Sequence, residues 1–203
     1  MTDDRRATID ADIADLLARG EVEAAVERVL QAHGASIYGM IAGVFHDTAV
    51  AEDVFQHFSI ELWKSLPSFQ GRSSIYTWAY VLARRAVTHR LRRKTSAREQ
   101  RLHTGEQEAL VARQWSRRAT AEWQRTETKS RFRELCEGLP HEERLLVMLR
   151  IGEKMSWKQI ARVIHDDGDE GTPLDEESLT REAATLRKRF ERVKTKLRDA
   201  LAG

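Results

Sequence analysis

Apolar residues recur along this 203-residue chain with the period of a helix, and strand-like alternation of apolar and polar residues is absent. Only three prolines and eleven glycines interrupt the pattern. The pattern predicts helices at residues 21–32, 36–46, 51–66, 75–94, 156–164 and 175–200, and a further helix that starts at Pro140. Gly34 is expected to end the first of them. The fold class is therefore predicted to be all-α.

The predicted helix at residues 75–94 has an apolar back and a basic front. Ser73 or Ser74 can cap its first amides. The core side holds Ile75, Ala79, Leu82, Ala83 and Ala86. The opposite side holds Thr77, Arg84, Arg85, Thr88 and Arg92, with Trp78 at the boundary. Cations and hydroxyls bind phosphates and an aromatic ring can stack on an unpaired base, so this side is a candidate nucleic-acid surface. The alternative is a solvated charged face, with Trp78 packed at least partly in the core.

The predicted helix at residues 51–66 carries apolar groups on two sides. Its core side holds Ala51, Val54, Phe55, Phe58 and Leu62. Its far side holds Asp53, Gln56, Ile60, Trp63 and Lys64. An exposed apolar pair within a polar rim, here Ile60 and Trp63, is typical of a protein interface. The alternative, equally open from this helix alone, is that another helix of the same domain covers the pair.

The last third of the chain indicates a short helix, a connection and a longer helix. Ser156 is the expected cap of the short helix, and an acidic, glycine-rich loop at residues 165–173 leads to the long one. The outer face of the long helix is basic and includes Arg181, Lys188 and Arg192. This arrangement predicts a helix-turn-helix whose second helix enters the major groove of DNA. An ordinary helical hairpin with a solvated basic face is the alternative.

Charge and cysteine content narrow the class further. The net charge is only +2, but basic residues crowd into residues 84–94, 113–133 and 181–198, which favours a polyanionic partner. The single cysteine, Cys136, cannot form an internal disulfide, which fits a reducing compartment. No apolar run has the length of a membrane span, and the polar N-terminus is unlike a signal peptide. A cytoplasmic protein is expected.

Motifs that would carry catalysis are missing from the sequence. It holds no phosphate-binding glycine-rich loop with a lysine, no His-Glu-x-x-His and no nucleophile elbow. The seven histidines are scattered, and Cys136 has no Cys or His partner at ligand spacing. The chain is therefore not expected to be an enzyme, and neither a metal nor a cofactor is expected.

Taken in order, these segments resemble a bacterial RNA polymerase sigma factor of the sigma-70 family, of the extracytoplasmic-function (ECF, group IV) type. Ala51-Glu-Asp-Val-Phe-Gln56 with Leu62-Trp63 resembles the helix that binds the polymerase clamp. The segment Phe69-Gln-Gly-Arg-Ser-Ser-Ile-Tyr-Thr-Trp78, with the arginines that follow, resembles the part that reads the −10 element and melts the promoter. Leu139-Pro140, Ser156-Trp-Lys-Gln-Ile-Ala161 and Thr185-Leu-Arg-Lys-Arg-Phe-Glu-Arg192 resemble the −35 helix-turn-helix.

The resemblance implies promoter recognition, DNA melting and three binding surfaces. Those implied for core polymerase are Asp53, Gln56, Ile60 and Trp63. Those implied for −10 DNA are Phe69, Gly71, Arg72, Ser73, Ser74, Trp78, Arg84, Arg85, Thr88 and Arg92, the first five of which would trap a flipped base. Those implied for −35 DNA are Arg181, Thr185, Arg187, Lys188, Arg189 and Arg192. The implied partners are core RNA polymerase (the clamp coiled coil of its largest subunit, and the flap), double- and single-stranded promoter DNA, and, as in many relatives, an anti-sigma factor.

The domain organisation implied by the resemblance is two small helical domains joined by a flexible linker. Residues 1–20 are expected to be an extension with a loose or marginal helix. The remaining divisions are region 2 at residues 21–95, the linker at 96–124 and region 4 at 125–203. The two domains are expected to move freely about the linker.

Two departures from the family pattern leave alternatives open. His57 stands where the family usually has an acid, so the pattern leaves this clamp contact open. The turn before the −35 helix, at about residues 165–181, is long. Either the helix gains an N-terminal turn that brings Arg181 and Glu182 to DNA, or an acidic loop projects and the −35 assignments shift. Masking of the basic helix by the acidic residues of this loop is a separate hypothesis. Two rival functions remain, a helix-turn-helix regulator that acts without core polymerase and a helical adaptor for acidic proteins.

Overall fold

The computed structural model describes residues 3–45, 47–93, 114, 118–119, 136, 138–165 and 174–202. Every regular element in these residues is helical, which confirms the predicted all-α class. The elements are α1 (Asp3–Ala18), α2 (Val22–Phe45), α3 (Thr48–Ser65), the 3₁₀ turn η1 (Leu66–Ser68), α4 (Ile75–Arg93), α7 (His141–Val147), the π-helical turn η2 (Met148–Gly152), α8 (Trp157–His165) and α9 (Glu176–Ala202). Almost all of the predicted linker and residues 166–173 of the acidic loop lie outside the described residues.

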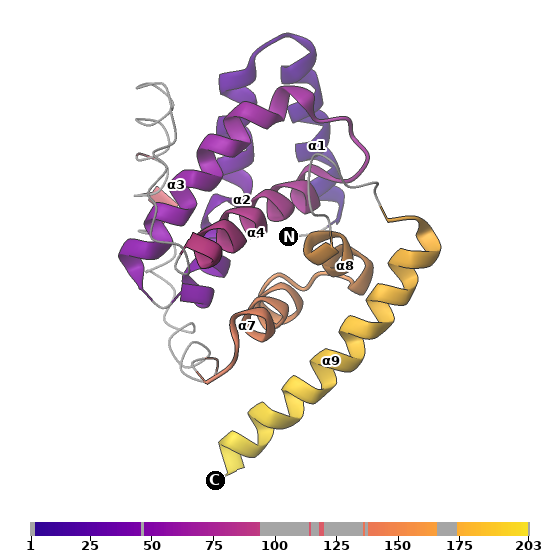
Figure 1. Cartoon of the computed structure of the whole chain (residues 1–203). Coiled ribbons are helices and arrows are strands. Elements are labelled where there is room, and N and C mark those ends of the chain that lie inside the picture. Colours follow the sequence, from indigo (N-terminus) through magenta and orange to yellow (C-terminus); the bar gives the residue numbers. More distant parts are fainter. Residues whose placement is uncertain are drawn as a thin grey trace.

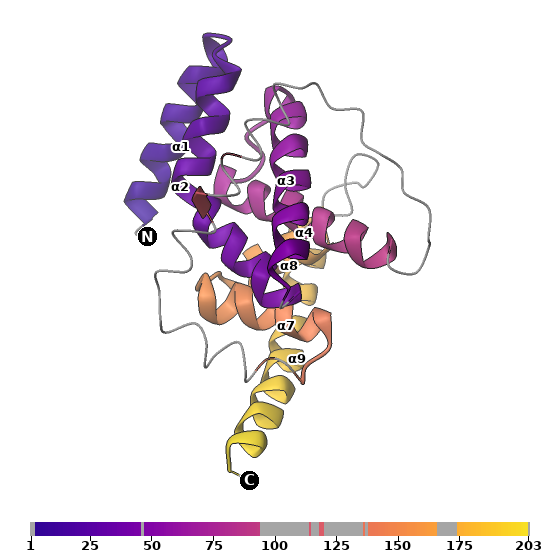
Figure 2. The ribbon, with the colours of Figure 1, turned by 90° about the vertical axis from the view of Figure 1, so that its left-hand side faces the viewer.

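Helix α1 is part of the core, which corrects the expectation of a loose N-terminal helix. Its Ile9 and Ile13 are buried, and it lies beside α2 (Figure 2). The turn to α2 closes with a paired motif: the Glu21 amide donates to Leu16 at 2.9 Å, and the Gly20 amide donates to Leu17 at 3.0 Å. Gly20 has a φ of 75°, the left-handed conformation that this helix end requires. These isoleucines, with Leu16 and Leu17 packed against the same core, hold this largely polar helix on the bundle.

Helix α2 runs without a break from Val22 to Phe45, so the prediction that Gly34 ends a helix is wrong. Gly34 is buried in the middle of α2, where a methyl group would lie 3.7 Å from the ring of Phe55 on α3. Packing of α2 against its neighbours outweighs the modest cost of one glycine inside a helix. The two predicted helices at residues 21–32 and 36–46 are one element.

Helix starts were predicted well because their signals are local. Asp47 accepts hydrogen bonds from the Ala49 and Val50 amides at the start of α3. At the start of α8 the Gln159 amide donates to the Ser156 hydroxyl at 3.3 Å, and the Ser156 amide donates to the Gln159 side chain at 2.9 Å. These bonds satisfy amides that a helix leaves without partners in its first turn.

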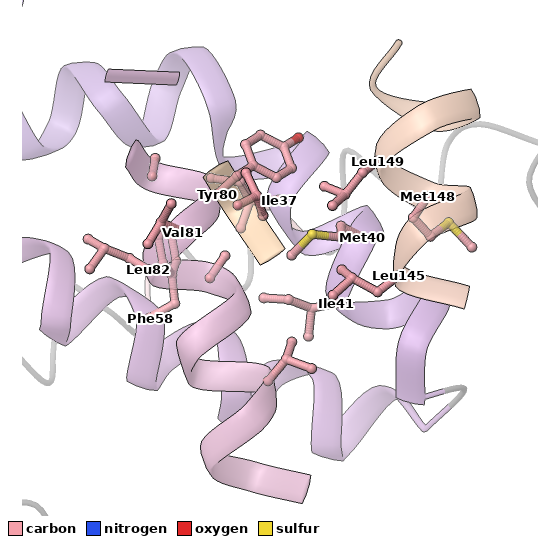
Figure 3. Close-up of a cluster of buried hydrophobic side chains, with 14 of the residues drawn as sticks. Ile37, Met40, Ile41, Phe58, Tyr80, Val81, Leu82, Leu145, Met148 and Leu149 are labelled. Carbon is pink, nitrogen blue, oxygen red and sulfur yellow. The ribbon is translucent and has the colours of Figure 1, made fainter. Parts of the chain in front are cut away.

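The C-terminal helices pack on the N-terminal bundle instead of standing apart from it. Helix α8 lies against α4, and α7 and η2 lie against α2 (Figure 1). Figure 3 shows Leu145 and Leu149 pointing toward Met40 and Ile41 of α2. One continuous cluster of buried apolar residues includes side chains from both parts. In this arrangement the C-terminal part covers apolar surface on α2 and α4. It therefore differs from the expected pair of freely moving domains.

Two features show that the C-terminal part fits closely against α2. A methyl group added to Gly43 of α2 would lie 2.8 Å from the sulfur of Met148, so a larger residue there would displace the end of that side chain. The Arg144 guanidinium donates to the Val44 carbonyl at 2.8 Å and to the Leu139 carbonyl at 2.7 Å. A cation at the end of α2 satisfies a carbonyl in its last turn and suits the negative end of the helix dipole.

Candidate functional site

The loop at residues 69–74, between η1 and α4, is anchored at its first residue. The Phe69 amide donates to the Leu66 carbonyl at 3.1 Å, and the Phe69 ring lies 5.1 Å from that of Trp78 on α4. Gly71 has a φ of 68°, a conformation that side-chain-bearing residues rarely adopt. Arg72 is exposed beside it. The loop thus presents a cation and a half-buried aromatic pair together.

The other end of the loop is anchored by the cap of α4. The Thr77 amide donates to the Ser74 hydroxyl at 3.2 Å, so of the two serines predicted as caps Ser74 is the one used. The two hydroxyls of Ser74 and Thr77 lie 3.0 Å apart. The Ile75 amide donates to Asp10 of α1 at 3.2 Å. Sequence analysis missed Asp10 because no local pattern links α1 to a loop so far along the chain.

The predicted basic face of α4 is only partly open to solvent. Arg92 is exposed, whereas Arg84, Arg85 and Thr88 are half-buried and the two arginines contact other groups of the chain. Thr77, which the pattern placed on the same face, is 2% exposed, so that placement is wrong. Helix α4 meets α1, α2, α3 and α8, which leaves little of its circumference uncovered.

The polymerase-facing side predicted on α3 differs at one position. Asp53 is exposed, and Gln56 and Trp63 are half-buried. Ile60 is 8% exposed, so the prediction of an exposed Ile60–Trp63 pair is wrong for its first member. Helix α3 packs against both α2 and α4, which buries apolar residues on two sides of it. Trp63 packs on the core and supplies the accessible apolar surface of this side.

Helix α9 presents most of its predicted cations outward. Thr185, Arg187, Lys188 and Arg192 are exposed. Arg189 differs, because it is directed to α7, where it donates to Glu142 at 2.8 Å. Since α9 begins at Glu176, Arg181 lies in the second turn of the helix, which supports the alternative of an extra N-terminal turn. Arg181 is exposed and pairs with Glu177 at 3.0 Å.

Helices α8 and α9 are held at a fixed angle by an aromatic contact and by ion pairs. The Trp157 ring meets Phe190 edge-on at 5.5 Å, and the Arg150 guanidinium lies 4.7 Å above Trp157. Glu176, at the start of α9, accepts from Lys158 at 2.7 Å and from Arg162 at 3.3 Å. These interactions fix the start of α9 relative to α8.

Comparison with known proteins identifies the N-terminal part. Residues 29–97 match the family model of sigma-70 region 2, from within α2 to just beyond α4, and so include the loop and α3. The chain therefore contains a sigma-70 region 2 domain. The RNA polymerase sigma-H factor of Pseudomonas aeruginosa is 28% identical to it over 163 residues, which are 76% of this chain and 82% of the relative. No solved structure matches the chain significantly.

The structure brings α1, which the sequence did not link to region 2, against that region, and it sets His57 beside a second histidine. Helix α1 precedes the matched residues yet contacts the first turn of α4 through Asp10 and Arg6. His57 of α3, where the family usually has an acid, lies 4.8 Å from His89 of α4 between ring centres. Burial, with the charge of His89, lowers the pKa of His57. His57 is therefore predominantly neutral at pH 7 and adds no charge to the side of α3 that carries Gln56.

In the residues that the structure describes, neither a metal site nor a reactive thiol is favoured. No three His, Cys, Asp or Glu side chains gather there in a way that could hold a metal ion. Burial raises the pKa of the Cys136 thiol, which disfavours the reactive thiolate. None of the helices described has both the length and the apolarity needed to span a bilayer.

Proposed function

We propose that this protein is a sigma factor of the ECF type, which binds core RNA polymerase and directs it to promoters through −10 and −35 contacts. The observation that carries the proposal is the region 2 match over residues 29–97, which covers both the clamp-like helix α3 and the anchored loop at residues 69–74. Placement of a cation, a tilted aromatic pair and a basic helix next to one another suits a single strand with unstacked bases. The cytoplasm is the compartment in which this activity belongs.

The polymerase contact is assigned to α3. Asp53, Gln56 and Trp63 remain accessible in part and would meet the clamp coiled coil, while the buried Ile60 would support Trp63 from beneath. A half-buried tryptophan with a polar surround is the type of residue that dominates the binding energy of protein interfaces. An anti-sigma factor that covers this side would block polymerase binding.

The −10 and −35 contacts are assigned to separate parts. Loop residues Phe69, Gly71, Arg72 and Ser73 would hold a flipped −10 base, with the α4 arginines on the phosphates behind it. Ser74 is engaged as a helix cap and would contribute through the loop's shape. In the C-terminal part, Arg187, Lys188 and Arg192 are the exposed α9 cations that would reach the −35 duplex, and the polymerase flap would hold this part in place.

The proposal is tested by reconstitution with bacterial core polymerase and Trp63→Ala protein. We expect the substitution to weaken core binding at least ten-fold, the loss typical of a buried interface anchor. Trp78→Ala is the matched control: it removes a half-buried tryptophan from the same bundle, and we expect it to retain core binding but lose transcript. Wild-type protein that forms no core complex, or that binds duplex DNA equally well without core, would favour the rival regulator.

A further inference from the structure

Helix α1 contacts the first turn of α4 at two consecutive residues. The Ile75 amide donates to the Asp10 carboxylate at 3.2 Å, and the Arg6 guanidinium lies 4.2 Å above the ring of Tyr76. Helix α1 is itself braced on α2, where Arg28 donates to Asp12 at 2.7 Å. Its inward side therefore acts on the start of α4 from a fixed position, although α1 lies outside the region 2 match.

Both amides described at the start of α4 have side-chain partners. Ser74 accepts from the Thr77 amide, and Asp10, 65 residues upstream of Ile75, accepts from the Ile75 amide. The second cap comes from a different helix, so it determines where α4 begins relative to α1 as well as satisfying a donor. The loop at residues 69–74 ends at this point.

We propose that Asp10 is a positioning residue for −10 recognition, which holds the start of α4 and thereby the path of the loop at residues 69–74. The inference rests on the proposed function of that loop. The loop is attached at one end by Phe69 on Trp78 and at the other by Ser74 and Asp10. Between these points Gly71 adopts a positive φ that few residues tolerate. The path of the loop therefore depends on this turn and on the two attached ends.

The charge of Asp10 supports a positioning role over a DNA contact. An anion beside a surface for phosphates repels them, whereas at a helix N-terminus it is favoured by the helix dipole. Partial burial raises the pKa of Asp10, and the hydrogen bond from Ile75 opposes that rise. The Asp10 carboxylate is therefore held in the position where its oxygen accepts from the Ile75 amide. A neutral acceptor at this position would keep the cap and remove the repulsion.

The experiment compares holoenzymes made with wild-type, Asp10→Ala and Asp10→Asn protein. Each transcribes a template library randomised at the −10 and −35 elements, and the transcribed templates are sequenced. We expect Asp10→Ala to lower base preference at −10 roughly five-fold, the effect of losing one helix cap of ordinary strength, with −35 preference unchanged. Asp10→Asn should restore −10 preference because its amide oxygen can still accept from Ile75.

Base preference separates positioning from plain loss of stability, since a smaller folded fraction lowers the yield of all templates alike. Asp15→Ala is the control, because it breaks an exposed ion pair with Arg19 at the end of α1 that does not brace α1 on α2. If Asp10→Ala proves unfolded, Asp10→Glu displaces the carboxylate by one methylene and should shift −10 preference in the same direction. Equal preference for all variants would overturn the inference and leave the proposed function standing. A wild-type holoenzyme that selects no template would overturn the proposed function itself.

Discussion

His33 on α2 is buried in an environment that disfavours protonation of its imidazole. It is 2% exposed, its ring meets that of Tyr76 edge-on at 5.3 Å, and burial, with the charges of Arg6 and Arg28, lowers its pKa to about 4. Tyr76 and Tyr80 beside it are likewise buried, and burial raises the pKa of both phenols. This junction of α1, α2 and α4 is therefore uncharged apart from the groups at its edge.

His33 makes the stability of the protein fall as the pH falls. In the unfolded chain His33 titrates near its ordinary value of 6.5, so between pH 6.5 and about 4 the unfolded state binds a proton that the folded state does not. We expect this residue to lower the free energy of unfolding by about 2 kcal/mol between pH 7.5 and pH 5. Urea unfolding at both pH values measures it. His33→Phe should lose that share of the pH dependence, and an unchanged dependence would contradict the assignment.

At the scale of the element, α9 offers neighbouring cations with different surroundings. Lys188 is exposed on the predicted −35 face, while Arg189 donates to Glu142 of α7. We expect Lys188→Ala to weaken promoter binding by the holoenzyme and to reduce its salt slope by about one, because one phosphate contact is lost. Arg189→Ala, the matched control, should leave the slope unchanged. Dissociation constants at several salt concentrations measure both, and equal slopes for the two variants would reject the assignment.

Local signals in the sequence predicted the elements better than they predicted exposure. The caps Asp47, Ser74 and Ser156 were predictable because each bonds an amide two or three residues away. Exposure depends on which helices lie alongside. Thr77 and Ile60 were expected outside and are buried, since α4 and α3 each have neighbours on more than one side.

The candidate site shows the same division between local and distant causes. The loop residues and the basic helix were predictable from one contiguous stretch. Asp10 was not, because its partner lies 65 residues away and a single acid on a polar helix has many other uses. The assembly of the two helical parts was not predictable either, since it depends on a small residue, Gly43, that matches a large one, Met148.

At the scale of the whole molecule, the packed arrangement cannot reach both promoter elements at once. A compact chain of this length has a radius of gyration of about 17 Å. Elements roughly 25 base pairs apart lie about 85 Å apart along B-form DNA. Contact with both elements, as proposed, therefore requires the two helical parts to separate, and 44 residues lie between Arg93 and Gly138 in the sequence.

Gly43→Leu is expected to loosen the contact between the parts, because its side chain occupies the place of Met148. We expect a larger radius of gyration by small-angle X-ray scattering, with helical content retained because Met148 lies outside the N-terminal bundle. Gly34→Ala is the matched control in the same helix, where an added methyl makes only ordinary contacts. A Gly43→Leu protein as compact as the wild type would show that the parts are held by other contacts.

Arg144 has a consequence for dissecting the protein. Its guanidinium closes the end of α2 from a position 100 residues downstream. A fragment cut after α4 would leave the Val44 carbonyl to water and the apolar flank around Met40 bare. Such a fragment should fray at the C-terminal end of α2 and self-associate through the exposed apolar surface. Binding affinities measured on separate halves of the molecule will therefore be lower than those of the intact chain.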